Sequence, residues 1–177
     1  MGFCLFNNVA VAAAAALARG LERVAVVDID VHHGNGTQWA FYSEPRVLYV
    51  STHQFPFYPG TGAADETGSG AGAGYTLNIP LPAGSGDEAY RQAYERVATR
   101  LGEYAPQLLL ISAGFDAHAD DPLASMYVTV AGYAGIVRQL LDAVECPVAL
   151  VTEGGYDLPA LRACLEATIG VLDSGAP

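Results

Sequence analysis

The alternation of apolar, strand-like runs with segments expected to be helices constrains the fold of this chain more than any other feature. Four largely apolar runs, at residues 23–30, 46–52, 107–116 and 147–157, have the length and continuity of strands buried on both faces of a sheet. A shorter strand is expected at residues 75–81. Helices are expected between the strands, at residues 7–19, 36–42, 87–104, 129–144 and 158–172. This order predicts a three-layer α/β/α fold with a mainly parallel sheet, in a single domain over residues 1–177.

The charge and length of the chain exclude several classes of function. Its 177 residues, 51% of them apolar, suffice for one core and are too few to argue for two domains. Nineteen acidic against eight basic residues give a net charge of −11, so no direct nucleic-acid partner and no anionic membrane is expected. All eight bases are arginines, which excludes a Schiff-base lysine, a phosphate-binding P-loop lysine and a lysine general base.

The cysteines and the N-terminal segment indicate a cellular compartment. Cys4, Cys146 and Cys164 are widely spaced and include no C-x-x-C pair, so they are expected to be buried free thiols in a reducing environment. No basic segment followed by an apolar stretch marks a signal peptide, and no apolar run approaches about 18 residues. We therefore expect a cytoplasmic protein with no membrane partner.

Three of the expected strands end in polar side chains, in the sequences DIDVHH, SAGFDAHADD and EGGYD. Ligands of open parallel sheets bind at the carboxyl ends of the strands, so these ends are predicted to converge on one site. Asp28, Asp30 and His32 fall at i, i+2 and i+4, which places them on one face of an extended backbone. Asp116, from another strand end, would complete an open three-ligand site for a divalent metal.

Other interpretations of these residues compete with a metal site. The acids could cap backbone amides in a strand-end turn. A calcium loop at residues 116–123 fits less well, because Gly is absent from its sixth position and Pro122 interrupts it. An aspartyl-nucleophile phosphohydrolase would normally need a lysine, which this sequence lacks. His53 is expected to be a structural hydrogen-bond partner, and Trp39 a core residue.

Five segments taken together, GFCLFNN, DIDVHHGNGTQ, FYPGTG, SAGFDAHADDPL and EGGYDL, resemble the zinc-dependent histone deacetylase and acetylpolyamine amidohydrolase family. The resemblance covers nearly the whole chain, in order. It implies the arginase–deacetylase fold and hydrolysis of an acetyl amide on a lysine side chain or a polyamine. Asn35, where some relatives carry Asp, is similar to the class II branch.

The resemblance also implies a role for individual residues. Zinc would be held by Asp30, His32 and Asp116, and the hydroxyl of Tyr156 would donate to the substrate carbonyl as it becomes an oxyanion. Leu123 occupies a tunnel-rim position where polyamine-selective relatives carry an acid, which favours acetyl-lysine as substrate. The remaining implied positions are Asp28 and Asn35 as partners of two histidines, Gly2, Phe3 and Tyr58 in the substrate tunnel, and Asp28 with Ser51 at a site for a monovalent cation such as K+.

One departure from the family pattern affects catalysis. The family's tandem histidine pair, its general base and acid, lies upstream of the GFC motif, whereas the tandem pair here is His32–His33. His33 is expected on the other side of the strand from His32 and could not easily replace that pair. The chain is therefore expected to be the C-terminal part of a deacetylase domain, inactive alone, that pairs with an upstream segment of the same domain or forms a homo-oligomer. Two alternatives stay open: an arginase-like ureohydrolase with two manganese ions, and a non-catalytic zinc or acyl-lysine-binding module.

Overall fold

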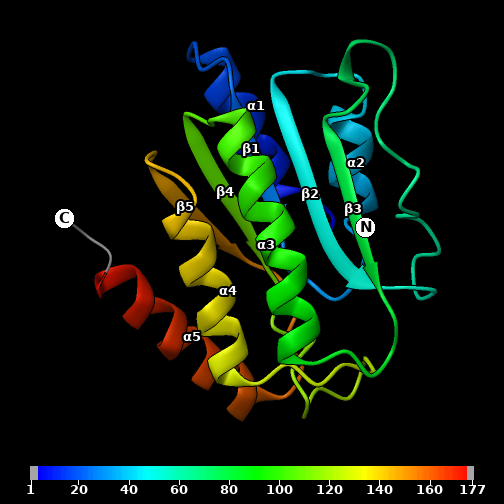
Figure 1. Cartoon of the computed structure of the whole chain (residues 1–177), viewed down its shortest axis with the longest axis vertical. Coiled ribbons are helices and arrows are strands. Elements are labelled where there is room, and N and C mark those ends of the chain that lie inside the picture. Colours follow the sequence, from blue (N-terminus) through cyan, green and yellow to red (C-terminus); the bar gives the residue numbers. More distant parts are fainter. Residues whose placement is uncertain (1–3, 175–177) are drawn as a thin grey trace.

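Five parallel strands form the centre of the molecule, which the computed structural model describes over residues 4–174 (Figure 1). Their order across the sheet is β3-β2-β1-β4-β5, and every neighbouring pair is parallel. The bounds are β1 Val24–Asp28, β2 Val47–Gln54, β3 Thr76–Leu81, β4 Leu108–Ala113 and β5 Val148–Thr152. These pairings confirm the predicted parallel sheet.

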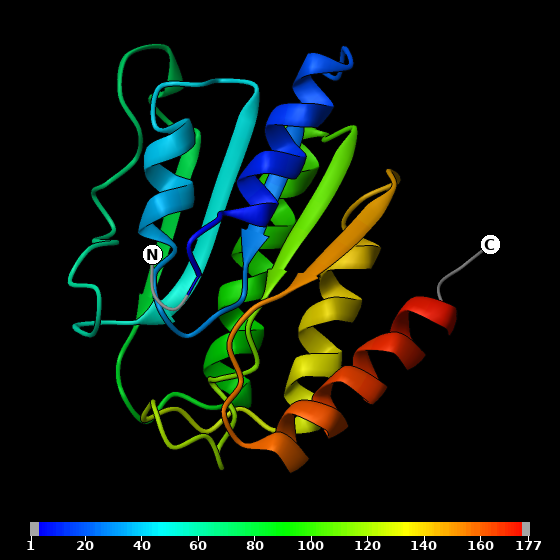
Figure 2. The same ribbon diagram turned by 180° about the vertical axis from the view of Figure 1, so that it is seen from behind.

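Helices cover both faces of the sheet, which confirms the three-layer architecture (Figures 1 and 2). On one face lie α1 Asn8–Ala18 and α2 Asn35–Phe41. On the other lie α3 Asp87–Tyr104, α4 Val130–Asp142 and α5 Leu158–Ser174. The long segment between β2 and β3 contains only a short 3-10 helix, Gly70–Gly72. Within residues 4–174, no helix combines the length and apolar character needed to cross a membrane.

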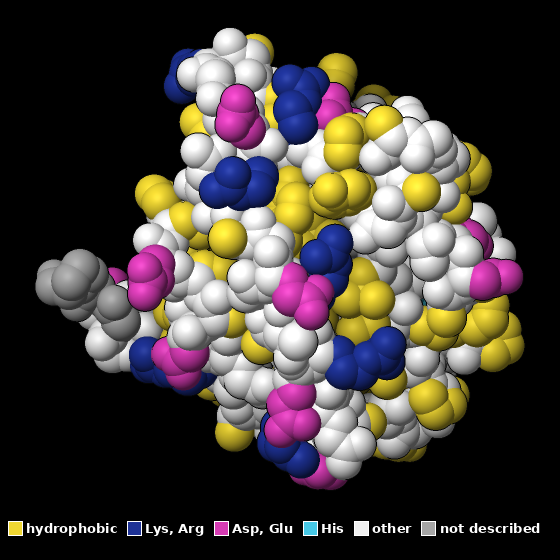
Figure 3. All heavy atoms as spheres, turned by 45° about the horizontal axis from the view of Figure 1, so that its top comes forward, with side chains coloured by type: hydrophobic (Ala, Val, Ile, Leu, Met, Phe, Trp, Pro, Cys, Tyr) yellow, Lys and Arg dark blue, Asp and Glu magenta, His cyan; other side chains and the backbone are white. Residues whose placement is uncertain are grey.

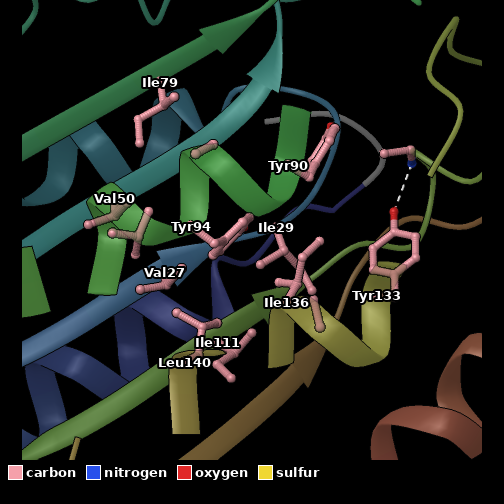
Figure 4. Close-up of a cluster of buried hydrophobic side chains, with 14 of the residues drawn as sticks. Val27, Ile29, Val50, Ile79, Tyr90, Tyr94, Ile111, Tyr133, Ile136 and Leu140 are labelled. Carbon is pink, nitrogen blue, oxygen red and sulfur yellow. Dashed lines mark hydrogen bonds between the residues drawn. The ribbon is translucent and has the colours of Figure 1, made fainter. Parts of the chain in front are cut away.

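The larger core lies between the sheet and α3 and α4 (Figure 4). Val27, Val50 and Ile111 from the sheet pack there with Tyr94 and Ile136 from the helices. Burying an apolar side chain of this size contributes about 1.5–3 kcal/mol. The hydroxyl of Tyr133, on α4, accepts a hydrogen bond from the backbone N of Ala117 at 3.0 Å. This contact ties the core to the loop that follows β4, which carries Asp116.

The register of the strands aligns their carboxyl ends at the edge of the sheet where the loop after β4 begins. Asp28 at the end of β1 pairs with Ser51 of β2 on one side and with Ser112 of β4 on the other. All residues of β1 and β2 are buried, whereas β5, at the edge of the sheet, is only half-buried. β5 pairs in parallel with β4, so the carboxyl ends of β1, β4 and β5, which carry the three polar sequence endings, lie at one edge of the sheet as predicted.

Several local predictions need correction. β1 ends at Asp28, so Asp30 and His32 lie in a bend and not on an extended strand. Trp39 was expected in the core but is 61% exposed, on the outer side of the short helix α2. The cysteines are free as predicted, although Cys4 is exposed and only Cys164 is fully buried.

Arginine side chains are distributed among acidic ones on the surface. On the face shown in Figure 3, basic and acidic side chains alternate between apolar ones. Arg46 pairs with Glu44, Arg91 with Glu88, and Arg162 with Glu166. Exposed pairs of this kind add little stability. Because acidic side chains lie between the arginines, the face shown in Figure 3 carries no continuous basic surface.

Candidate metal centre

Asp30, His32 and Asp116 meet at the carboxyl edge of the sheet. Nδ1 of His32 lies 3.1 Å from Oδ1 of Asp30 and 3.0 Å from Oδ2 of Asp116. One ligand atom from each residue can be chosen so that all three lie within 4.8 Å of one another. In residues 4–174 this is the one group of three His, Cys, Asp or Glu side chains close enough to hold an ion. The structure thus brings together the three residues that the sequence indicated as ligands.

Backbone hydrogen bonds to the carboxylates shape the bend that carries His32. Oδ1 of Asp28 accepts from the N of Asp30 at 3.2 Å, and Oδ1 of Asp30 accepts from the N of His32 at 2.8 Å. Oδ1 of Asp116 accepts from the N of Val31 at 2.8 Å, across 85 residues of sequence. A hydrogen bond to an ionised acceptor contributes about 1.5–3 kcal/mol to stability, and one to a neutral acceptor about 0.5–1.5 kcal/mol. The acids therefore hold the bend as well as offering ligand atoms.

Two glycines allow the loops to approach these carboxylates. A Cβ on Gly114 would lie 2.2 Å from Oδ2 of Asp30, and a Cβ on Gly154 would lie 2.4 Å from Oδ2 of Asp116. Both distances are shorter than any real Cβ contact. The N of Gly154 also donates to Oδ2 of Asp30 at 3.2 Å. Glycine is required at both positions because backbone lies directly against the ligand carboxylates.

The charges of the site fit a divalent cation. Burial raises the pKa of Asp116 to about 6, and the neighbouring charge of Asp30 adds to this effect. Burial lowers the pKa of His32, but hydrogen bonds to Asp116 and Asp30 outweigh it and raise the pKa to about 10. The two carboxylates thus attract positive charge between them, and buried acids are costly without it. Two carboxylate oxygens and one imidazole nitrogen form a donor set that zinc accepts, with coordination positions left open.

Tyr156 and Leu123 lie on loops next to the ligands. Tyr156, in the loop after β5, is 38% exposed, and burial together with Asp116 and Asp30 raises its pKa to about 12. Its hydroxyl therefore stays protonated at neutral pH and can donate a hydrogen bond. Leu123, in the loop after β4, is 42% exposed. The backbone amides of Tyr156 and Leu123 both donate to the carboxylate of Asp121. The sequence did not indicate Asp121 as a site residue.

Aromatic side chains border His32 on the side of the loop after β2. The ring of Tyr58 meets His32 edge-on at 6.2 Å between centroids, and Tyr58 is 57% exposed. Phe57 stacks on His32 at 5.4 Å. Sequence reasoning overlooked Phe57, although the aromatic-rich segment FPFYP was a signal for it. Gly2 and Phe3, the other expected tunnel residues, lie outside the described residues.

His33 and His53 belong to a buried polar network behind the ligands. His33 bonds through Nδ1 to Oγ1 of Thr61 at 2.7 Å and through Nε2 to Oε1 of Gln38 at 2.9 Å. His53 bonds through Nδ1 to Oγ of Ser51 and through Nε2 to the carbonyl of Gly62, both at 2.9 Å. His33 thus engages partners other than the ligand group, as predicted, and the structural role expected of His53 is confirmed.

Asp28 and Asn35 lie at the two ends of the segment that carries the ligands. Burial, with the charge of Asp30, raises the pKa of Asp28 well above its usual range. Oδ2 of Asp28 accepts from the hydroxyl of Tyr49 at 3.2 Å. Oδ1 of Asn35, at the start of α2, is buried and has no hydrogen-bond partner among the described residues.

Comparison with known proteins identifies the family. The profile of the histone deacetylase domain matches residues 1–172. The chain belongs to the histone deacetylase family. A probable deacetylase of Archaeoglobus fulgidus is 47% identical to it over 89% of this chain and 45% of that protein. An acetylpolyamine amidohydrolase of Burkholderia pseudomallei is 43% identical over 96% of this chain and 50% of that protein.

Solved structures of the histone deacetylase family confirm the arginase–deacetylase fold. The crystal structure of the HDA15 HD domain superposes with a TM-score of 0.94 at 45% identity, covering all of this chain and 52% of that one. The chain therefore spans about half the length of the relatives it matches. Its fold corresponds to about half of their chains, and the described ligand group lies within that half.

Proposed function

We propose that this chain is the zinc-holding part of a deacetylase that hydrolyses acetyl amides, with acetyl-lysine on a protein as its substrate. The observation that carries the proposal is the meeting of Asp30, His32 and Asp116 beside Tyr156 in a member of the histone deacetylase family. When bound, zinc supplies a Lewis acid that polarises the acetyl carbonyl and activates a water molecule. Acetylpolyamine is the alternative substrate, and the apolar Leu123 in place of an acid favours acetyl-lysine.

Tyr156 would stabilise the charge that develops on the substrate oxygen. Its pKa of about 12 keeps the phenol protonated at neutral pH. A hydrogen-bond donor placed beside a developing oxyanion typically contributes about 3 kcal/mol to the rate. The half-buried ring of Phe57 and the exposed ring of Tyr58 would flank the acyl chain on the side of His32.

The general base and acid would come from the part of the domain N-terminal to this chain. His33 and His53 are occupied in the buried network, and Nδ1 of His118 accepts from the N of Asp120. The buried oxygen of Asn35 has no partner in residues 4–174, and leaving such an acceptor unsatisfied costs about 1–3 kcal/mol. Asn35 and Asp28 are thus suited to accept hydrogen bonds from two histidines of that segment. Asp28 with Ser51 would hold the monovalent cation.

A comparison of two proteins tests this function. One is the 177-residue chain, and the other includes the upstream, histidine-bearing segment of the domain. We expect about one zinc per chain in both, and hydroxamate-sensitive hydrolysis of an acetyl-lysine peptide mainly in the longer protein, since general acid–base groups contribute about 100- to 10,000-fold. A metal content near two manganese ions would instead indicate ureohydrolase chemistry. Zinc binding without hydrolysis in both proteins would indicate a non-catalytic module.

A further inference from the structure

The carboxylate of Asp121 connects the two loops that carry Asp116 and Tyr156. Asp121 is only 7% exposed. Its Oδ2 accepts from the backbone N of Tyr156 at 2.7 Å, and its Oδ1 accepts from the N of Leu123 at 2.9 Å. Asp121 lies five positions after Asp116. One buried side chain thus joins the ligand loop, the rim residue and the tyrosine loop.

Within residues 4–174, hydrogen bonds hold the tyrosine loop on both sides of Gly155. On the strand side, the N of Phe115 donates to the carbonyl of Gly154 at 2.7 Å, and the N of Gly154 donates to Asp30. Gly155 follows with φ +144, a conformation open mainly to glycine. Beyond it, Asp121 holds the amide of Tyr156. Loss of this hydrogen bond would remove one restraint on the backbone between Gly155 and Tyr156, and with it a restraint on the position of the phenol.

We propose that Asp121 is a positioning residue for deacetylation, which fixes the hydroxyl of Tyr156 relative to the metal ligands; this inference rests on the function proposed above. Asp121 acts through the backbone of Tyr156. A displacement of about 1 Å at a reacting group can cost about 100-fold in rate, so a single anchor of this kind has a measurable effect.

Hydrogen exchange tests the anchor independently of activity. The exchange of the Tyr156 amide is followed in the zinc-loaded protein after selective nitrogen-15 labelling of its tyrosines. Replacing Asp121 by Ala removes both acceptor oxygens and is expected to speed this exchange at least tenfold. Asp120→Ala is the matched control, because the neighbouring side chain is 76% exposed and its carboxylate faces Nδ1 of His118 at 3.8 Å. Equal exchange of the Tyr156 amide in wild type and Asp121→Ala would overturn the proposal.

A double-mutant cycle tests the effect on catalysis. In the protein that includes the upstream segment, Asp121→Asn is expected to lower kcat about tenfold, since one amide oxygen cannot serve both backbone donors. In a Tyr156→Phe background the same change should lower kcat less than twofold, because the hydroxyl it positions is gone. A general loss of structure would slow both backgrounds equally and would overturn the proposal.

The outcomes separate this inference from the proposed function. A wild-type protein that binds zinc but does not deacetylate would contradict the function. The exchange measurement would still show whether Asp121 anchors the Tyr156 loop. An active wild type with an unchanged Asp121→Asn variant would leave the function standing and contradict the role of Asp121.

Discussion

Nδ1 of His32 lies 3.0 Å from Oδ2 of Asp116, although the two residues are 84 positions apart in the chain. The same nitrogen faces Asp30 at 3.1 Å, so one ring atom is shared between two acids. A nitrogen in this position binds either a proton or a metal ion. The contact therefore marks the place where a bound cation would lie, and it is the starting point for the first prediction.

Removing either partner of this contact should abolish tight metal binding. We expect about one zinc per chain in the wild type and loss of high-affinity zinc in His32→Ala and Asp116→Ala, because two ligands seldom hold zinc firmly. Metal analysis after dialysis, with calorimetric titration, measures this. Asp120→Asn, whose side chain lies outside the group, should bind zinc normally. Full zinc retention in both ligand variants would show that the site lies elsewhere.

Tyr156→Phe should separate catalysis from metal binding. In the protein with the upstream segment, loss of the hydroxyl should lower kcat about 100- to 1,000-fold, as found for single oxyanion donors. Zinc content should not change, since the ligand set does not include this residue. Steady-state kinetics on an acetyl-lysine peptide, together with metal analysis, gives both quantities. An unchanged kcat would remove Tyr156 from the chemistry.

Gly154→Ala should damage the metal centre without changing any ligand. The added methyl would lie 2.4 Å from Oδ2 of Asp116 and 2.8 Å from Oδ2 of Asp30, so the loop or the carboxylates must move. We expect zinc affinity to fall at least tenfold. Gly102→Ala, inside α3 with open space around its Cβ position, is the matched control. It should bind zinc normally and be more stable by about 0.5–1 kcal/mol. Equal zinc affinity in the two variants would contradict the close approach of the loop.

His53 should make the fold less stable in mild acid. Burial, and then the charge of His33, lowers the pKa of His53 from 6.5 to about 4. Between these values the unfolded chain binds a proton that the folded chain does not, so stability falls as the pH drops from 6.5 to 4. The full loss is about 3 kcal/mol, and about 2 kcal/mol of it falls between pH 6.5 and 5.

Urea unfolding of wild type and His53→Gln at pH 7 and pH 5 checks this contribution. The variant should be less stable at pH 7, because it loses hydrogen bonds to Ser51 and Gly62. Its disadvantage should shrink by about 2 kcal/mol at pH 5, since glutamine does not titrate. A disadvantage of the same size at both pH values would mean that His53 titrates normally in the folded protein.

The free edge of β5 should make the 177-residue chain associate. Strands of parallel sheets are usually buried on both faces, yet β5 is half-exposed although four of its five residues, VALVT, are apolar. An unpaired edge of this kind is a template for another strand. We expect self-association at micromolar concentration, relieved when the upstream segment is present. Size-exclusion chromatography with light scattering measures this, and a stable monomer would contradict it.

The sequence alone determined the layer architecture and the three ligand candidates. Continuous apolar runs indicate strands buried on both faces, and parallel neighbours bring their carboxyl ends to one edge, so Asp30, His32 and Asp116 could be expected to meet. These inferences succeed because an apolar run is a local feature of the sequence, and the burial of a strand follows directly from its apolar side chains.

Only the tertiary structure decided how the site is built. An extended backbone would have grouped Asp28 with Asp30 and His32, whereas the bend after Asp28 turns its carboxylate into a support for the backbone. The stacking of Phe57 on His32 and the bond from Tyr156 to Asp121 join separate loops, and no local pattern encodes them. Trp39 reads as a core residue and is exposed because α2 is short and lies at the surface. Contacts between loops depend on how segments distant in the sequence pack together. The spacing of residues within one segment does not determine that packing.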